Sequence, residues 1–248
     1  MEKILIASGK GGVGKSTMAV CLANALCARG KRVLLADCDV GLRSLDLLTG
    51  LGSGAVYSWL DLLLENCTAA DALLQDEKKP LALLTAPNRL ETPLEPFAFS
   101  EMLSVFDADF DFCLLDAGAG LSDLLTVFGG AADRALLVAT PDAVSARAAA
   151  AAAELLQETT LSAENLRLVL NRYGRQDVRY GTSLSADEMI DATALQLLGA
   201  VPEDVHLRGL SRGETAASPA AEAFARIAAR LCGETVPFRE KKLKSVLS

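Results

Sequence analysis

Residues Gly9–Thr17 read G-K-G-G-V-G-K-S-T, and this stretch determines which fold the chain can adopt. It directly follows the apolar run Ile4–Ala7 and directly precedes the helix-forming stretch Met18–Ala28. A glycine-rich loop between a strand and a helix turns its backbone N–H groups inward around a polyphosphate, and the helix N-terminus adds partial positive charge. We therefore expect a phosphate site, with Lys15 on the terminal phosphates and the Ser16 hydroxyl on Mg²⁺.

The alternative is a glycine-rich turn that binds no ligand. The coincidence of strand, loop, Lys-Ser pair and helix at one place argues against that alternative. The residues expected to surround the phosphates are Gly11, Gly12, Val13, Gly14, Lys15, Ser16 and Thr17.

Length and composition fit one α/β domain with a sizeable core, residues 1–236, followed by a basic tail, residues 237–248. A net charge of −8 disfavours nucleic acid as a partner, although a local basic patch can override it. The six cysteines form no CxxC pair, which predicts buried thiols in a reducing cytoplasm. The N-terminus leads straight into the first strand, and no apolar run approaches the ~20 residues of a membrane span, so we expect a soluble, at most peripheral, protein.

Apolar runs alternate with helical patterns along the whole chain, which predicts a mostly parallel central sheet flanked by helices in a three-layer α/β fold. The expected strands are Ile4–Ala7, Arg32–Ala36, Leu81–Thr85, Phe110–Leu115, Ala135–Ala139, Leu166–Asn171 and Leu197–Val201. The expected helices are Ser16–Arg29, Tyr57–Glu65, Phe99–Phe106, Leu121–Gly129, Ser145–Glu158, Ala186–Leu195 and Pro219–Cys232. Ligands of such sheets bind outside the carboxyl ends of the strands.

Acidic residues stand at two of these strand ends. Asp37 and Asp39 flank Cys38 after the second strand, and Asp116 ends the strand that begins near Phe110. Carboxylates beside a phosphate loop can order the water bound to Mg²⁺ and the attacking water. An aspartate that only caps the next loop is the alternative for either residue of the first pair. Asp116 has the Walker B arrangement and is expected to bind the Mg²⁺ shell through water.

The stretch K-G-G-V-G-K-S-T resembles the deviant Walker A motif of the MinD/ParA ATPases, a family with the P-loop NTPase fold. This resemblance implies that Lys10 crosses to the nucleotide of a second subunit and stabilises charge on the transferring phosphoryl group, as an arginine finger does. A solvated lysine is the alternative. The cofactors implied are ATP or ADP and Mg²⁺, and the first partner implied is a second copy of the chain.

The switch segments extend the resemblance. The sequence D-C-D-V-G-L-R-S-L-D from Asp37 to Asp46 resembles switch I of the family, which implies that Asp39 orients the hydrolytic water and Asp37 supports the metal. After Asp116, however, relatives usually carry Ser or Thr and then Pro, where this chain has Ala117-Gly118. The loss of the fixed proline φ predicts a looser switch II. Gly120 matches the family glycine whose backbone meets the terminal phosphate.

The resemblance also implies an adenine pocket after the last two strands. Its residues here are Asn171, whose side chain would read the base, with Pro202 and Asp204. Each of them alone is an ordinary turn or helix-start residue.

The last ten residues, R-E-K-K-L-K-S-V-L-S, form a basic tail in which Leu243, Val246 and Leu247 share one face of a helix. Family members end in an amphipathic helix that lies on the membrane, so an anionic membrane surface is an implied partner. Three aliphatic side chains supply at most ~1.5–3 kcal/mol each, so two copies on a dimer would bind more usefully than one. A solvated basic terminus is the alternative.

The function implied is an ATP-dependent dimerising switch that hydrolyses ATP to ADP and phosphate and places the division septum, with a MinC-like inhibitor and a MinE-like or other activator. It would work in the cytoplasm and reversibly at the inner face of the membrane. A ParA-like DNA-moving ATPase or a flagellar-placement ATPase is the alternative within the family. A metabolic enzyme such as dethiobiotin synthetase shares the fold, but the Asp39–Asp46 switch argues against it. The six alanines Ala148–Ala153 stand where relatives place polar, partner-binding residues, which leaves the partner open.

Overall fold

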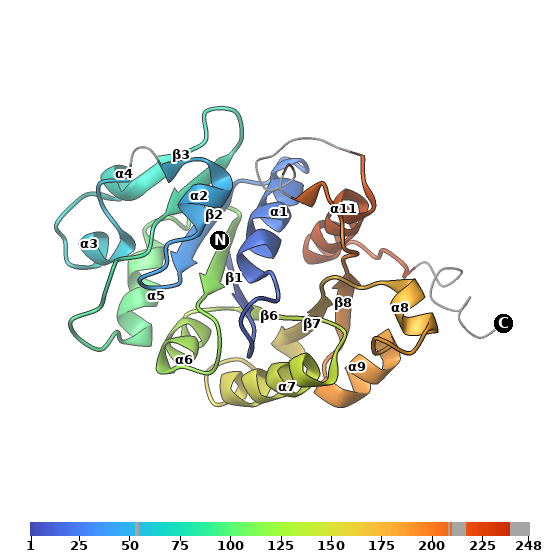
Figure 1. Ribbon diagram of the computed structural model, residues 1–248. Helices are drawn as coiled ribbons and strands as arrows, with labels where there is room; N and C mark the ends of the chain where they lie inside the picture. Colours follow the sequence, from blue (N-terminus) through green and yellow to red (C-terminus); the bar gives the residue numbers. More distant parts are fainter. Residues whose placement is uncertain (53–54, 208, 210–216, 239–248) are drawn as a thin grey trace.

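The computed structural model describes residues 1–52, 55–207, 209 and 217–238. In this part of the chain the apolar runs form one sheet of eight strands in the order β3-β4-β2-β5-β1-β6-β7-β8 (Figure 1). Every neighbouring pair is parallel except β3 and β4, which are antiparallel. The strands are β1 (Glu2–Ala7), β2 (Val33–Cys38), β3 (Leu73–Gln75), β4 (Leu81–Leu84), β5 (Phe112–Ala117), β6 (Arg134–Ala139), β7 (Leu166–Leu170) and β8 (Leu197–Ala200).

Helices cover both faces of the sheet, which explains why the parallel strands are apolar throughout. In β2, for example, Leu34 and Ala36 belong to one core and Val33 and Leu35 to the other. The helices are α1 (Lys15–Cys27), α2 (Leu45–Thr49), α3 (Trp59–Leu63), α4 (Ala69–Ala72), α5 (Pro96–Ser104), α6 (Asp123–Gly130), α7 (Ala143–Gln157), α8 (Arg175–Arg179), α9 (Ala186–Thr193), α11 (Pro219–Leu231) and the 3₁₀ turn Ala163–Asn165.

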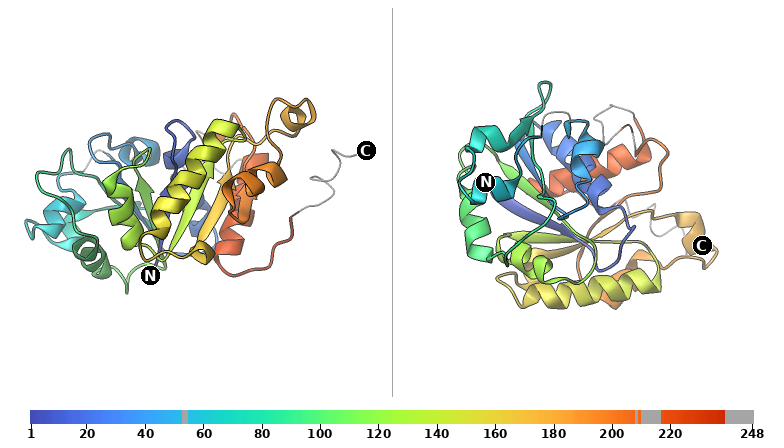
Figure 2. Two further views of the ribbon diagram at one scale, coloured as in Figure 1. Left: turned by 90° about the horizontal axis from the view of Figure 1, so that it is seen from below. Right: turned by 60° about the vertical axis from the view of Figure 1, so that its left-hand side comes forward.

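The two covering layers are unequal. Helices α1 and α11 pack side by side on one face, and α5, α6, α7 and α9 lie on the other, as the views of Figures 1 and 2 agree. The second face also holds a cluster of rings, in which Trp59 lies 5.2 Å from Phe99 and 6.3 Å from Phe128 between ring centroids. The expected three-layer α/β fold is confirmed.

The expected strands and helices all occur, with ends that differ by at most three residues. The largest shift is in α5, which begins at Pro96 rather than at the expected Phe99 because proline fits the first turn of a helix. The short elements α2, α4, α8 and β3 were not expected. Three to five residues carry no visible periodicity, and the edge strand β3 depends on pairing with β4 rather than on its own pattern.

The alanine run forms the middle of α7, as expected. Ala149, Ala152 and Ala153 are buried, and small side chains there let α7 pack closely on the sheet. All six cysteines are free thiols, and four of them are buried. Among the described residues, no helix is both long enough and apolar enough to cross a bilayer.

Candidate nucleotide-binding site

The phosphate loop connects β1 to α1, and two glycines set its backbone. Gly12 and Gly14 have φ values of +77° and +91°, in the left-handed region that favours glycine. Gly14 is the N-cap residue of α1, and no side chain in the described ranges caps this helix. The first N–H groups of α1 therefore lack side-chain partners, which is the arrangement that binds anions at a helix N-terminus.

A third glycine lets the loop approach α7. A Cβ at Gly9 would collide with the backbone carbonyl of Ala148, so only glycine fits between β1 and this helix. Beside it, the Ser8 hydroxyl donates to the carbonyl of Lys10 at 2.9 Å, and Ser8 accepts the N–H of Gly120 at 3.1 Å. The start of the phosphate loop is thus joined to the loop that follows β5.

The Gly120 contact bears on the expected role of that residue. Its φ of +91° agrees with a special turn position, but its N–H donates to Ser8 in this structure. Contact between that N–H and a terminal phosphate would require the loop after β5 to move. The phosphate role of Gly120 therefore stays a prediction.

Lys15, the first residue of α1, is the buried cationic residue of the site. Only 7% of its surface is exposed, and its positive charge lowers the pKa values of the Asp39 and Asp116 carboxyl groups. The three residues come from the ends of β1, β2 and β5, which are neighbours in the sheet. The structure thus brings together the lysine and two of the acids that the sequence singles out.

Asp116 is fully buried, and neither of its carboxylate oxygens makes a hydrogen bond of good geometry among the described residues, although the Ser16 hydroxyl is close enough to interact with one of them. Burial raises its pKa to about 7, although the Ser16 hydroxyl and Lys15 act in the opposite direction. A buried carboxylate without a partner is costly, so such a group in a native site calls for an explanation. A Mg²⁺ ion with its bound water, placed near Ser16, would supply the missing partner.

The rest of the site fits this metal. Mg²⁺ usually keeps several waters and binds one or two protein oxygens together with the substrate phosphates. The described residues include no group of three or more His, Cys, Asp or Glu that could hold a metal ion. Asp116 and Ser16 therefore have the right chemistry for a nucleotide-bound Mg²⁺.

Asp37 lies beside Asp116 in the register of β2 and β5, but its carboxylate is already engaged. One oxygen accepts the N–H of Asp39 and the other accepts the N–H of Leu45, both at 3.0 Å. The indole N–H of Trp59 also donates to the carbonyl of Asp37 at 2.8 Å. Asp37 thus holds the loop after β2 in place, and its support of the metal stays a prediction.

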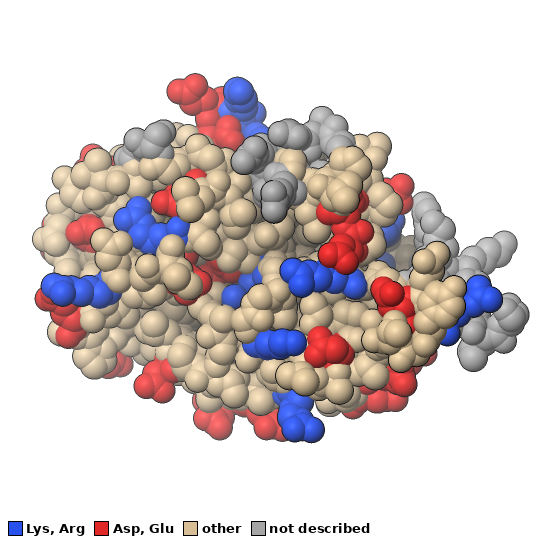
Figure 3. Space-filling model, viewed as in Figure 1, with Lys and Arg blue, Asp and Glu red and all other residues tan. Residues whose placement is uncertain are grey.

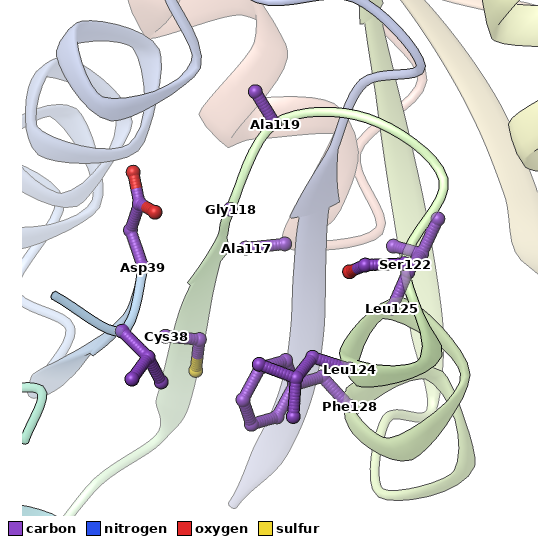
Figure 4. Close-up of a pocket in the computed structure, with 10 residues that line it drawn as sticks. Cys38, Asp39, Ala117, Gly118, Ala119, Ser122, Leu124, Leu125 and Phe128 are labelled. Atoms are coloured by element: carbon purple, nitrogen blue, oxygen red, sulfur yellow. The ribbon is translucent and has the colours of Figure 1, made fainter. Parts of the chain in front are cut away.

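Asp39 is partly buried, and its carboxylate faces the loop after β5. A Cβ at Gly118 would lie 3.1 Å from one of its oxygens, so this approach is close because the chain has glycine there (Figure 4). Burial raises the pKa of Asp39, and Lys15 counteracts this effect. No hydrogen bond to its carboxylate occurs within the described residues, which leaves the oxygens available to a water molecule.

A cavity of about 150 Å³ lies between the loop after β2, which contains Asp39, and the loop after β5. Cys38 lines one side, Ser122 and Phe128 of the α6 segment line the other, and Ala117 and Gly118 lie between them (Figure 4). Ala117 and Gly118 leave space here because their side chains are small, and the looser switch II stays a prediction.

Lys10 makes an ion pair within its own chain. Its Nζ lies 3.6 Å from the carboxylate of Asp142, which also accepts the N–H of Ser145 and so caps α7. Both side chains are partly exposed and border a pocket of about 310 Å³ that Arg172 also lines. Sequence analysis missed Asp142, although an aspartate at the start of a helix was a visible signal. The role of Lys10 in a second subunit stays a prediction.

The three residues of the expected adenine pocket have different surroundings. Asn171 is buried, and its side chain contacts the phosphate loop. Pro202 lies two residues after the end of β8 and is partly exposed. The Asp204 carboxylate accepts the N–H groups of His206 and Ala220, at 2.9 and 3.1 Å, and so faces the start of α11. A contact between Asp204 and a base stays a prediction that would compete with these bonds.

Known proteins resemble the chain over nearly its whole length. The family model of the CobQ/CobB/MinD/ParA nucleotide-binding domain matches residues 4–216. The septum site-determining protein MinD of Helicobacter pylori is 34% identical over 252 residues, covering 97% of this chain and 94% of that protein. MinD of Bacillus subtilis is 33% identical over 246 residues, covering 96% and 91%.

Solved structures agree with this result. A chain of the MinC:MinD cell division protein complex of Aquifex aeolicus superposes with a TM-score of 0.86 at 31% identity, covering 96% of this chain and 99% of that one. The septum site-determining protein MinD of Pyrococcus horikoshii, complexed with Mg-ADP, gives a TM-score of 0.78 at 26% identity, with coverage of 93% and 95%.

Proposed function

The chain belongs to the CobQ/CobB/MinD/ParA nucleotide-binding family, as a MinD/ParA-type ATPase, and from this premise we propose that it is a MinD-like switch. In this proposal ATP and Mg²⁺ bind at the phosphate loop, two copies of the chain then associate, and hydrolysis to ADP and phosphate separates them. The cycle would regulate where the division septum forms.

One observation carries the nucleotide part of the proposal. The buried Asp116 carboxylate has no well-formed hydrogen bond among the described residues, and the Ser16 hydroxyl and Lys15, at the uncapped start of α1, are the groups that lower its pKa. A site with a buried acid, a buried cation and free helix N–H groups is suited to a phosphate–Mg²⁺ pair and to no purely structural purpose that we can identify.

The residues then have distinct tasks. Lys15 and the first N–H groups of α1 would bind the phosphates, while Ser16 and, through water, Asp116 would hold Mg²⁺. The metal, when bound, neutralises charge that develops on the phosphates. Asp39 would orient the attacking water, because its carboxylate is close to Lys15 and accepts no hydrogen bond from the described residues.

Exposed apolar side chains support association through the site edge. Among the described residues, large apolar side chains that are more than half exposed include Leu42, Leu47, Leu121, Val144, Tyr180 and Val205, in the segments that follow β2, β5, β6, β7 and β8. Val56, Leu64, Phe97 and Val105 are also more than half exposed, in the segments that follow β2 and β4. Apolar groups gathered on one edge favour a protein partner. A second copy would cover this edge, and Lys10 would leave Asp142 to reach the nucleotide of that copy.

Further partners follow from the relatives rather than from the site. We propose a MinC-like inhibitor, because a similar structure is a MinC:MinD complex, and an activator of the MinE type or another type. The exposed side of α7 carries few polar groups, among them Arg147 and Glu154, so the partners of this chain would contact α7 mainly through small side chains.

Surface charge gives no support to a DNA-binding alternative. On the face in Figure 3, acidic and basic side chains are interspersed over the described residues rather than gathered by sign. With a net charge of −8, such a surface repels a polyanion. The alternative ParA-like role would need a continuous basic surface.

The tail provides the experiment that separates these roles. Its residues, 239–248, lie outside the described part of the chain, so its membrane role rests on sequence alone. We expect the full chain with ATP and Mg²⁺ to sediment with anionic liposomes, and a chain without Leu243–Ser248 to stay in the supernatant, since deletion removes all three aliphatic side chains of the proposed helix face.

Two controls accompany the sedimentation assay. ADP in place of ATP should abolish binding of the full chain, and the truncated chain should still hydrolyse ATP. Equal sedimentation of both chains would reduce the tail to a solvated terminus. ATP-dependent binding to duplex DNA in a parallel assay, without binding to liposomes, would instead favour the ParA-like role.

A further inference from the structure

We propose that Asn171 positions the phosphate loop, in addition to any contact with the base, so that the base pocket and the phosphate site are mechanically joined. The proposal rests on nucleotide binding at this site. It assigns to one side chain two tasks that are otherwise separate, namely base contact on one side and orientation of a phosphate-binding N–H group on the other.

The contact is direct and buried. The Asn171 side-chain amide donates to the carbonyl of Val13 at 2.7 Å, across 158 positions of sequence. The residue is 6% exposed, and its own N–H donates to the carbonyl of Ala139 at 2.8 Å, which fixes it at the end of β7. Because β6 lies between β7 and β1, the contact joins segments that follow two strands which are not neighbours in the sheet.

The orientation of the amide is determined by its two neighbours. Its oxygen accepts the N–H of Arg172 at 3.0 Å, while its nitrogen faces the carbonyl of Val13. Exchanging oxygen and nitrogen would place two acceptors together at Val13 and two donors together at Arg172. Arg172 has a φ of +55°, a conformation uncommon for arginine, so the backbone accepts some strain where this contact forms.

The bond to Val13 also sets the direction of the next N–H group. The carbonyl of Val13 and the N–H of Gly14 belong to one planar trans peptide, in which the two bonds point in opposite directions. While Asn171 holds the carbonyl, the N–H of Gly14 must point away from Asn171. That N–H belongs to the residue directly before Lys15, in the glycine-rich turn that binds phosphates.

Packing restricts the same segment. A Cβ at Gly14 would lie 2.5 Å from the Asn171 side-chain nitrogen, so the amide rests directly against the glycine. The loop therefore contacts Asn171 at Val13 by a hydrogen bond and at Gly14 by van der Waals contact. Displacement of Asn171 would change the backbone that precedes Lys15.

A ligand without a base separates the two tasks. Inorganic tripolyphosphate offers the phosphates of ATP and nothing for a base pocket to recognise. We therefore measure inhibition constants of ATP and of tripolyphosphate, with Mg²⁺, against radiolabelled ATP. The chains compared are the wild type, Asn171→Ala, Asn171→Asp and the base-pocket control Pro202→Ala.

Asn171→Ala should weaken the binding of both ATP and tripolyphosphate by a similar factor of about ten. The reason is that the Val13 carbonyl loses its hydrogen-bond partner and the Gly14 N–H loses its fixed direction. Asn171→Asp keeps the size of the side chain and the acceptor for Arg172 but removes the donor, so it should weaken tripolyphosphate at least as much as Asn171→Ala. Pro202→Ala should weaken ATP and leave tripolyphosphate within about twofold.

Hydrogen exchange gives a second readout that a general loss of stability would not produce. In either Asn171 variant the amide of Met18, which donates to the Gly14 carbonyl at 2.9 Å, should exchange faster without nucleotide, while the amides of β4, at the far side of the sheet, keep wild-type rates. If the Asn171 variants bind ATP more weakly but bind tripolyphosphate as well as the wild type does, the proposal is overturned and Asn171 contacts the base only. A wild-type chain that binds neither ligand would instead overturn the nucleotide assignment itself.

Discussion

Replacing Lys15 with alanine should abolish detectable ATP binding. Lys15 is the only buried lysine or arginine among the described residues, and its charge acts on the buried acid Asp116 and on Asp39. Without its charge, a polyphosphate would approach uncompensated carboxylates at the same strand edge. A charge-assisted contact with a phosphate is among the stronger hydrogen bonds, and its loss here should weaken ATP more than about 100-fold, or about 2.7 kcal/mol.

Isothermal titration with Mg-ATP measures this loss, and Lys10→Ala is the matched control. Lys10 belongs to the same loop, but it pairs with Asp142 and is partly exposed. The control should keep ATP affinity in the single chain within a few fold, since its proposed target is the nucleotide of the other copy. If Lys15→Ala binds ATP nearly as well as the wild type, Gly9–Thr17 is not the phosphate loop.

Asp39→Ala should bind ATP normally and hydrolyse it about 10²- to 10⁴-fold more slowly, the range typical for loss of a group that positions or deprotonates water. Its carboxylate accepts no hydrogen bond from the described residues, so its removal breaks no contact that holds the fold. Asp37 differs, because its oxygens hold the N–H groups of Asp39 and Leu45. Replacing Asp37 would disturb the loop instead.

Single-turnover hydrolysis separates the chemical step from binding for the Asp39 variant. Asp46→Ala is the control on the same segment, because this acid pairs only loosely with Arg43, at 3.9 Å. It should keep turnover within about threefold, because the two charged groups are too far apart for a strong ion pair. Normal hydrolysis by Asp39→Ala would exclude its proposed role and direct attention to another group at the strand ends.

Local patterns predicted the parts of the molecule that depend on local chemistry. The glycines and Lys15 stand between a strand and a helix, and Asp116 ends an apolar run, so motif and position agree before any tertiary contact is known. The parallel strands were equally visible, since burial on both faces makes them apolar throughout.

Contacts between distant segments were not visible in the same way. The bond from Asn171 to Val13 joins residues 158 positions apart, and nothing in the sequence near either residue indicates it. The same holds for the pairing of Lys10 with Asp142 and for the bond from Trp59 to the carbonyl of Asp37. Such contacts depend on the order of the strands in the sheet, which periodicity does not fix.

The departure at Ala117-Gly118 has a structural counterpart. Two small residues leave room for the Asp39 carboxylate to lie against the backbone and for the cavity between the switch loops. In this chain the loop after β2 and the loop after β5 therefore approach each other at Asp39 and Gly118.

Sedimentation velocity of Asp39→Ala with saturating Mg-ATP, compared with ADP, tests the switch most directly, because slow hydrolysis preserves the ATP-bound state. We expect one species of twice the single-chain mass with ATP and a single chain with ADP. The double variant Lys10→Ala, Asp39→Ala should remain single in both. A single chain throughout, at concentrations where titration proves that ATP is bound, would contradict the account.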